Sequence, residues 1–192
     1  MSTLLLFNYQ LKTYLSEENN IFYLQNTNLA IQISKKTGDI ISLVCKNKNL
    51  LDPNNTAKIA IKPNTNKGKI VTMKSENRFP KFAKIYFKKE YSDKFVEYEF
   101  IIDSIDLCWK VEISSKIGVD KEINIEFCVP VINSMSHLFY PSADAPLVNE
   151  DIKKKKFIYR RDIIIPIITT YNLREDYGLT FVSPFEIPKP GL

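Results

Sequence analysis

Histidine, cysteine and glycine are scarce in this sequence, and each shortage excludes a class of site. The single histidine among 192 residues is His137, so a Ser-His-Asp triad or a histidine-rich metal site would need unusual partners. The three cysteines, Cys45, Cys108 and Cys128, are odd in number and show no CxxC spacing, which argues against a disulfide framework and a zinc site. We therefore expect a reducing compartment and no bound metal.

Signals for nucleotides, membranes and nucleic acids are also missing. The five glycines form no GxGxxG or Walker motif, and no HExxH sequence occurs, so we expect no cofactor. The apolar run at residues 4–7 is too short for a signal-peptide core, and no later run reaches the length of a membrane span. The net charge is +5, and the basic residues are scattered apart from the lysines at 153–156. This distribution argues against nucleic-acid binding. We expect a cytoplasmic protein.

Alternation of apolar and polar residues dominates the middle of the chain, at residues 82–131. Val96 and Tyr98, for example, alternate with Glu97 and Glu99. A period of two places one face of a strand on a core and the other in water. The outward residues are a plain mix of Lys and Glu, with no cluster suited to catalysis. Short turns between these stretches predict one antiparallel sheet of four strands, at 82–90, 94–103, 107–114 and 123–129.

Shorter strands are expected before this sheet. Turn signals separate them at regular spacing, such as those at residues 26–28 and 37–39, because Asn and Gly tolerate positive φ. One weak helical stretch falls at residues 13–19. The strands predict a second sheet packed on the first, and hence an all-β fold, a large antiparallel two-sheet sandwich. They are expected at 3–9, 21–25, 29–34, 39–44, 58–62 and 69–74.

The last third of the chain changes character. Residues 135–150 are rich in small, polar and proline residues and predict a long loop. Proline removes hydrogen-bond donors and stiffens the backbone, so residues 184–192, with three prolines, are expected to form an extended connector. The sequence thus predicts one sandwich domain at 1–183 and a connector at 184–192 to a missing C-terminal catalytic domain. Further strands are expected at 157–160, 163–170 and 178–183.

The loop at 135–150 holds the residues that most suggest a function. His137, Tyr140 and Asp144 lie in it, framed by prolines. Sugars are held by an aromatic face together with a few well-placed polar groups, so these three residues are predicted to bind substrate. The alternative is a structured crossover loop between sheets.

Arg160 and Arg161 stand between two expected strands, next to Asp162. Guanidinium groups hold carboxylates and phosphates through paired hydrogen bonds, so both arginines are predicted to contact a neighbouring domain or an anionic ligand. The alternative is a solvated ion pair that contributes little to stability. Glycoside hydrolysis needs two carboxylates that face each other across a sugar, and no spacing in the sequence selects such a pair. No catalytic residue is therefore assigned.

Residues 29–53 read LAIQISKKTGDIISLVCKNKNLLDP, which is an apolar strand, a Thr-Gly turn, a strand of the form I-x-S-L and a segment that reaches Leu-Leu. This stretch resembles a hairpin of galactose-mutarotase-like β-sandwich domains in carbohydrate-active enzymes. Residues 163–184 look like the closing strands that precede a catalytic barrel in multidomain glycoside hydrolases. The resemblance implies a supersandwich fold and the N-terminal domain of a glycoside hydrolase. Its partners would be carbohydrate and its own C-terminal catalytic domain.

Three functions are open at this point. The first is a carbohydrate-associated accessory domain, which packs beside the catalytic barrel and lends a loop to the sugar site. The second is a stand-alone sugar-binding or interaction module. The third is a sugar epimerase or lyase with its site around His137, Tyr140 and Asp144. The epimerases of this superfamily use a histidine acid and a glutamate base, and here His137 stands without a matching motif. A shared fold does not by itself decide among these functions.

Overall fold

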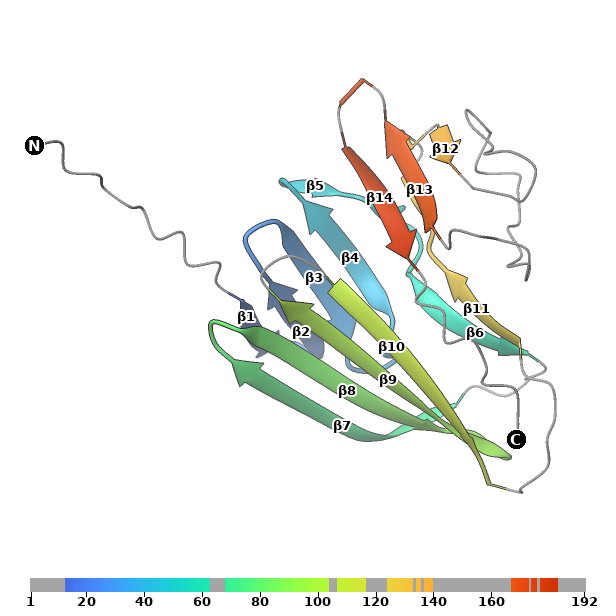
Figure 1. The fold of residues 1–192 in the computed structure, drawn as a ribbon. Coiled ribbons are helices and arrows are strands. Elements are labelled where there is room, and N and C mark those ends of the chain that lie inside the picture. The colour runs from blue at the N-terminus through green and yellow to red at the C-terminus, as the bar shows by residue number, and fades with distance from the viewer. Residues whose placement is uncertain are drawn as a thin grey trace, which may run out of the picture. The chain divides into compact units, whose positions relative to one another are not determined.

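The computed structural model describes residues 13–62, 68–103, 107–116, 124–132, 134–135, 137–139, 167–172, 174–175 and 177–182. Within these residues the chain forms antiparallel strands joined by turns, which confirms the expected all-β class (Figure 1). The described residues accordingly include no helix that could cross a membrane. The chain divides into two compact units, Met1–Pro130 and Val131–Leu192, and each is described by itself.

The first unit begins with a five-stranded sheet in which consecutive strands are neighbours. Asparagine and glycine provide the tight turns between them, since these residues tolerate positive φ. Gly38, for example, has φ 69° between the third and fourth strands. The strands are β1 (Tyr14–Glu18), β2 (Ile21–Gln25), β3 (Leu29–Ser34), β4 (Ile40–Cys45) and β5 (Lys48–Asn49).

The helix predicted at residues 13–19 is wrong, because this segment forms β1. Its residues pair with β2 from Tyr14 opposite Gln25 to Glu18 opposite Ile21. The turn between the two strands is Asn19-Asn20, with φ of 44° and 66°. Two successive positive φ values are the geometry of a two-residue hairpin turn, so tertiary pairing overrides a weak local helical preference.

The second sheet of this unit contains four antiparallel strands in the order β10-β9-β8-β7. The strand predicted at 123–129 does form, at Asn124–Cys128, but its predicted place as the fourth strand of this sheet is wrong. The position beside β8 belongs to β7, and β11 (Asn124–Cys128) pairs instead with β6 (Lys58–Lys62). Alternation shows which face of a strand is buried but not which strand is its neighbour. The four strands are β7 (Lys69–Arg78), β8 (Phe82–Glu90), β9 (Lys94–Asp103) and β10 (Leu107–Ser115).

Aromatic contacts join the two sheets into a sandwich. Phe22 of β2 meets Phe87 of β8 edge to face at 5.9 Å between ring centroids, and Phe87 meets Phe100 of β9 in the same way at 6.2 Å. Burying each such side chain stabilises the fold by about 1.5–3 kcal/mol. The buried apolar residues of this unit are Phe22, Leu24, Ile31, Ile33, Ile40, Leu43, Leu50, Leu51, Ala57, Ile61, Ala83, Ile85, Phe87, Val96, Tyr98, Phe100 and Ile102.

Asn26 ties the turn between β2 and β3 to the end of β9. Its buried side-chain oxygen accepts the backbone N–H groups of Asn28 and Leu29 at 2.8 and 2.7 Å, and its amide donates to the carbonyl of Asp103 at 2.8 Å. Thr13 makes a second such link by donating to the carbonyl of Pro80 at 3.1 Å. Buried polar side chains are tolerated when they are hydrogen-bonded in this way.

The second unit contains a three-stranded antiparallel sheet in the order β12-β13-β14. These strands are β12 (His137–Phe139), β13 (Ile167–Asn172) and β14 (Tyr177–Val182). The loop predicted at 135–150 is therefore wrong at its start, since three residues are too few for a period of two to be visible in the sequence. The predicted strands at 3–9 and 157–160, residues 140–150 and the connector at 184–192 lie outside the described residues.

We expect Phe87→Ala to lower the free energy of unfolding by about 3–5 kcal/mol, because it removes the ring that both Phe22 and Phe100 contact. Phe79→Ala is the matched control, since Phe79 is 55% exposed whereas Phe87 is 0% exposed. The control should change stability by less than about 0.5 kcal/mol. Urea unfolding midpoints measure both variants, and equal effects would contradict the sandwich packing.

Asn26→Asp should lower the free energy of unfolding by about 1–3 kcal/mol, because an oxygen replaces the amide donor that faces the Asp103 carbonyl. The carboxylate can still accept the N–H groups of Asn28 and Leu29. The change therefore tests only the hydrogen bond that the Asn26 amide donates. Asn28→Asp, at an exposed position of the same turn, is the control. Acidifying the solution should narrow the difference between the variants, because a protonated carboxyl regains a donor. Equal losses at both positions would show that Asn26 carries no such link.

Candidate functional site

Of the five residues that the sequence suggests for a site, the structure describes only His137. It is the first residue of β12, and its Cα partner across the sheet is Tyr171 of β13. Tyr140, Asp144, Arg160 and Arg161 lie outside the described residues. Their predicted contacts with sugar or with a neighbouring domain stay predictions.

Residues of the three-stranded sheet on the same side as Tyr171 form the first candidate, the Tyr171 face. One row across the sheet runs from His137 through Tyr171 to Gly178, and the next contains Thr169 and Thr180. The two threonine hydroxyls lie 3.1 Å apart, and Thr180 and Gly178 are exposed. This face therefore combines a partly exposed aromatic ring with hydroxyl groups.

Gly178 has a structural reason to stand opposite Tyr171. A Cβ atom at this position would lie 2.8 Å from the carbonyl oxygen of Thr170 and 3.1 Å from Cβ of Tyr171. Any larger residue would have to displace the backbone of β13.

The opposite face of the same sheet is buried and held by a polar network. The hydroxyl groups of Ser134 and Tyr177 lie 2.6 Å apart, and the Asn172 amide donates to the same tyrosine oxygen at 3.2 Å. The Asn172 oxygen accepts the backbone N–H groups of Arg174 and Glu175, which fixes the turn between β13 and β14. These contacts give the Tyr171 face a rigid support.

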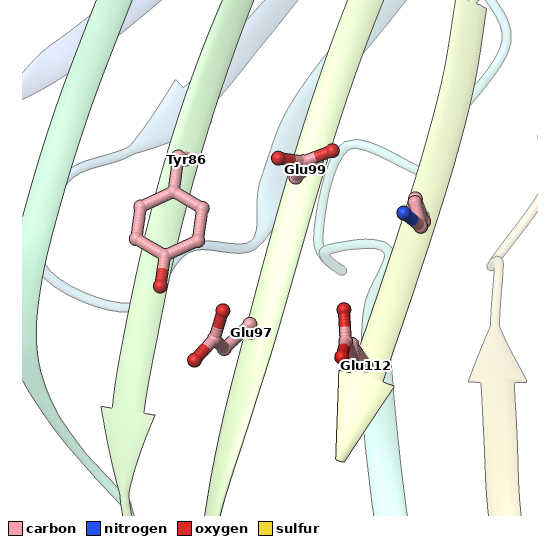
Figure 2. A pocket seen from close by; sticks show the side chains of 5 residues that line it. Tyr86, Glu97, Glu99 and Glu112 are labelled. Atoms are coloured by element: carbon pink, nitrogen blue, oxygen red, sulfur yellow. The ribbon is translucent and has the colours of Figure 1, made fainter. Parts of the chain in front are cut away.

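Charged side chains on the outer face of the four-stranded sheet form the second candidate, the glutamate face (Figure 2). Figure 2 shows Tyr86 of β8, Glu97 and Glu99 of β9, and Glu112 of β10 around a shallow hollow. The hollow has a volume of about 20 Å³, which is space for one water molecule and far too little for a sugar ring. Lys110 completes its lining.

Lysines of β8 neutralise the two glutamates of β9 on this face. Lys88 lies 2.8 Å from Glu97, directly across the sheet, and Lys84 lies 2.5 Å from Glu99 on the diagonal. Hydrogen bonds from Lys88 and then from Tyr86 lower the pKa of Glu97. Burial first, and then the hydrogen bond to Glu97 and the nearby carboxylate charges, raise the pKa of Tyr86 to about 12.

These pKa shifts do not suit acid catalysis of glycoside hydrolysis. A general acid needs a carboxyl group whose pKa is raised, so that it carries a proton near neutral pH. Glu97 is held in its charged form instead, and its neighbour Tyr86 is held protonated. The glutamate face is an ion-paired surface, as the alternation of Lys and Glu in the sequence predicted. The described residues contain no group of His, Cys, Asp and Glu that could hold a metal ion.

The Tyr171 face could not have been found from the sequence in the same way. Its residues come from three strands, and the first of them lies in a segment that we predicted as a loop. Alternation in the stretch Thr169-Thr170-Tyr171 gives no signal, because polar side chains occupy both faces. Only the register of β12 beside β13 brings His137 next to Tyr171.

Fold and sites together define an all-β protein with an antiparallel sandwich in its first unit. No protein-family model matches the sequence, and no curated protein matches it either.

Glu97→Gln should lower the stability at neutral pH by less than about 1 kcal/mol, because the ion pair with Lys88 is partly exposed to water. The pKa of Glu97 is lowered from its ordinary value of 4.5, so its contribution is present above that value and is lost as the pH falls through the lowered pKa. The variant should therefore lose less stability than the wild type below pH 4.5. Thermal unfolding across that range measures the effect.

Glu112→Gln is the matched control, because Glu112 lies directly opposite Glu97 on β10. Removing a like charge from this pair should leave stability at neutral pH unchanged or raised. If both variants lose stability equally, the ion pair of Glu97 has no specific role.

Proposed function

We propose that this chain is a carbohydrate-binding accessory domain of a glycoside hydrolase, and that a catalytic domain of the same protein performs the hydrolysis. The proposal rests on the segment at residues 29–53 that resembles the hairpin of galactose-mutarotase-like domains. Its support is the way in which the described structure uses each part of that segment.

The segment is a structural unit of the first sheet. The apolar strand of the resemblance is β3, the Thr-Gly turn contains Gly38, and the I-x-S-L strand is β4. The N–H of Gly38 donates to the carbonyl of Ser34 at 2.7 Å and closes the turn. Each of these parts is therefore a defined element of the first sheet.

The Leu-Leu end of the segment is an anchor in the core. Leu50 and Leu51 are both fully buried. The side-chain oxygen of Asn49 accepts the N–H groups of Leu43 and Leu51, each at 3.2 Å, and the N–H of Leu50 donates to the carbonyl of Leu43 at 2.7 Å. Asn49 thus turns the chain so that both leucines enter the sandwich.

The sugar would bind at the Tyr171 face. A pyranose presents an apolar ring face and a rim of hydroxyl groups, and it is recognised by an aromatic ring together with hydrogen-bonding side chains. Tyr171 supplies the ring, Thr169 and Thr180 supply hydroxyls, and His137 occupies the neighbouring register position. Tyr140 and Asp144 follow β12 in the sequence and are proposed as further contacts.

The glutamate face supports an accessory role over a hydrolytic one. Glu97 and Glu99 are paired with lysines, and the pKa of Glu97 is lowered. A second candidate function is an interaction module without sugar binding, which the open edge of β10 favours. A third, a sugar epimerase, would accelerate mutarotation of an aldose above the rate in buffer.

Affinity electrophoresis in gels that contain α-glucan, β-glucan, xylan, galactan or mannan tests the proposal with the full chain. Retarded migration in at least one of these gels, relative to a gel without polysaccharide, is the expected result. Tyr171→Ala should weaken binding by roughly tenfold, the effect of losing an aromatic contact of about 1.4 kcal/mol. Thr180→Val should weaken it by a smaller factor, because it removes one hydroxyl and keeps the shape.

Tyr14→Ala is the control, because Tyr14 is an exposed tyrosine of β1 in the other unit. It should migrate as the wild type does. Unchanged migration of the wild type in every gel would overturn the proposal. Release of reducing sugar by the chain alone would contradict the accessory role, and faster mutarotation would favour the epimerase.

A further inference from the structure

Within the described residues, one edge of strand β10 has no pairing partner. This strand is the outermost strand of the four-stranded sheet, and no described strand pairs with its other side. All nine of its residues pair with β9 in an unbroken register, from Leu107 opposite Ile102 to Ser115 opposite Lys94. It contains neither proline nor glycine. A long, regular edge strand is a template for pairing with another strand.

The opposite edge of the same sheet is protected. Strand β7 has a register shift between Ile70 and Thr72, and its exposed residues include Lys69, Lys74 and Arg78. Bulges and charged side chains are the features by which proteins block pairing at an edge. The two edges of the sheet thus differ, because the register of β7 is interrupted and that of β10 is unbroken.

Side chains on the inner face of β10 are incompletely covered. Trp109 stacks on the buried Phe100 at 5.2 Å between ring centroids. Its other aromatic contact, Phe127 of β11, is 52% exposed. The indole N–H of Trp109 is out of contact with water and has no acceptor among the described residues. Apolar residues at alternate positions of β10 are half-buried, and these are Leu107, Trp109, Val111 and Ile113.

The sequence of β10 is complementary to itself in the antiparallel direction. Val111 is its central residue, with four residues on each side. Two copies aligned about Val111 overlap along their whole length and place Lys110 of each opposite Glu112 of the other. Both residues point to the outer face and are exposed. The same alignment places Trp109 opposite Ile113 and Val111 opposite itself on the inner face.

We propose that two copies of this chain pair through β10 and form a symmetric dimer with its two-fold axis at Val111. The two four-stranded sheets then continue as one. A two-fold interface of this kind is self-complementary, so each favourable contact occurs twice. The two Lys110–Glu112 pairs and the apolar pairs on the inner face hold the strands in this register.

Neighbouring registers are disfavoured by the same charges. Side chains of two paired strands stay on their own faces only if the register shifts by an even number of residues. A shift of the centre to Lys110 places this lysine opposite its copy, and a shift to Glu112 places two glutamates opposite each other. Like charges directly across a strand pair destabilise it. The sequence therefore selects the register centred on Val111.

Glu112→Lys should weaken the dimer without destabilising the folded monomer. Within one chain the new lysine faces Glu97, so the monomer should keep or gain stability. Between chains it faces Lys110 of the second copy twice, so the dimer should dissociate with a dissociation constant raised by roughly tenfold or more. Lys110→Glu should have the same effect on the dimer. The double exchange Lys110→Glu/Glu112→Lys restores opposite charges between the chains and should restore the wild-type dissociation constant.

Sedimentation velocity over a range of concentrations measures these constants, and circular dichroism verifies that each variant is folded. The wild type should dimerise, with weaker association at high salt. A wild type that stays monomeric at every concentration overturns the proposal. A double exchange that dimerises no better than the single variants overturns the register.

A covalent trap tests the register independently. In the proposed dimer Ser114 lies opposite Cys108 of the other copy, and directly opposed Cα atoms in antiparallel strands are about 4.5–5.5 Å apart, within disulfide range. Ser114→Cys should therefore give a disulfide-linked dimer under mild oxidation. The same change combined with Cys108→Ser, and the oxidised wild type, are the controls and should remain uncrosslinked. Equal crosslinking in the controls, or none in Ser114→Cys, overturns the register.

Discussion

The edge-to-face contact between Phe22 and Phe87 is the interaction on which the first unit depends, because these rings belong to different sheets. From Phe87 the aromatic packing continues to Phe100, Trp109 and Phe127. Burial falls along this path, from fully buried phenylalanines to the half-exposed ring of Phe127. One continuous set of ring contacts thus stabilises the centre of the sandwich and also produces the partly covered apolar flank at its edge strand.

The pleat of the same strands places the packed apolar side chains on one face of the sheet and the charged side chains on the other. Residues that alternate with the core aromatics point outward, and there each glutamate of β9 has a lysine within ion-pair distance on β8. These pairs are partly exposed and contribute little to stability. Their effect is instead on register and on the pKa of Glu97, which stays charged. The outer face is therefore suited to specifying strand neighbours, within one chain and between two, and poorly suited to proton transfer.

Strand positions in the first unit could be predicted well, and pairing could not. The ranges of β2, β3, β6, β8 and β9 follow from alternation and turn residues, since both are local properties. The neighbours of β11 and β7 are not local, and here the sequence reading was wrong. The two candidate sites differ in the same respect. Glu97 and Glu99 were expected on one outward face, whereas the Tyr171 face depends on pairing between distant strands.

The amino-acid sequence alone determined that the protein is all-β and which faces of its strands are apolar. Each of these follows from the period of two and from the identity of single residues. Tertiary structure decided that residues 14–18 form a strand, that β6 receives β11, and that β10 is an edge. The physical reason is that a strand edge can pair with any strand of compatible pattern. Only the packing of the whole unit selects which partner it receives.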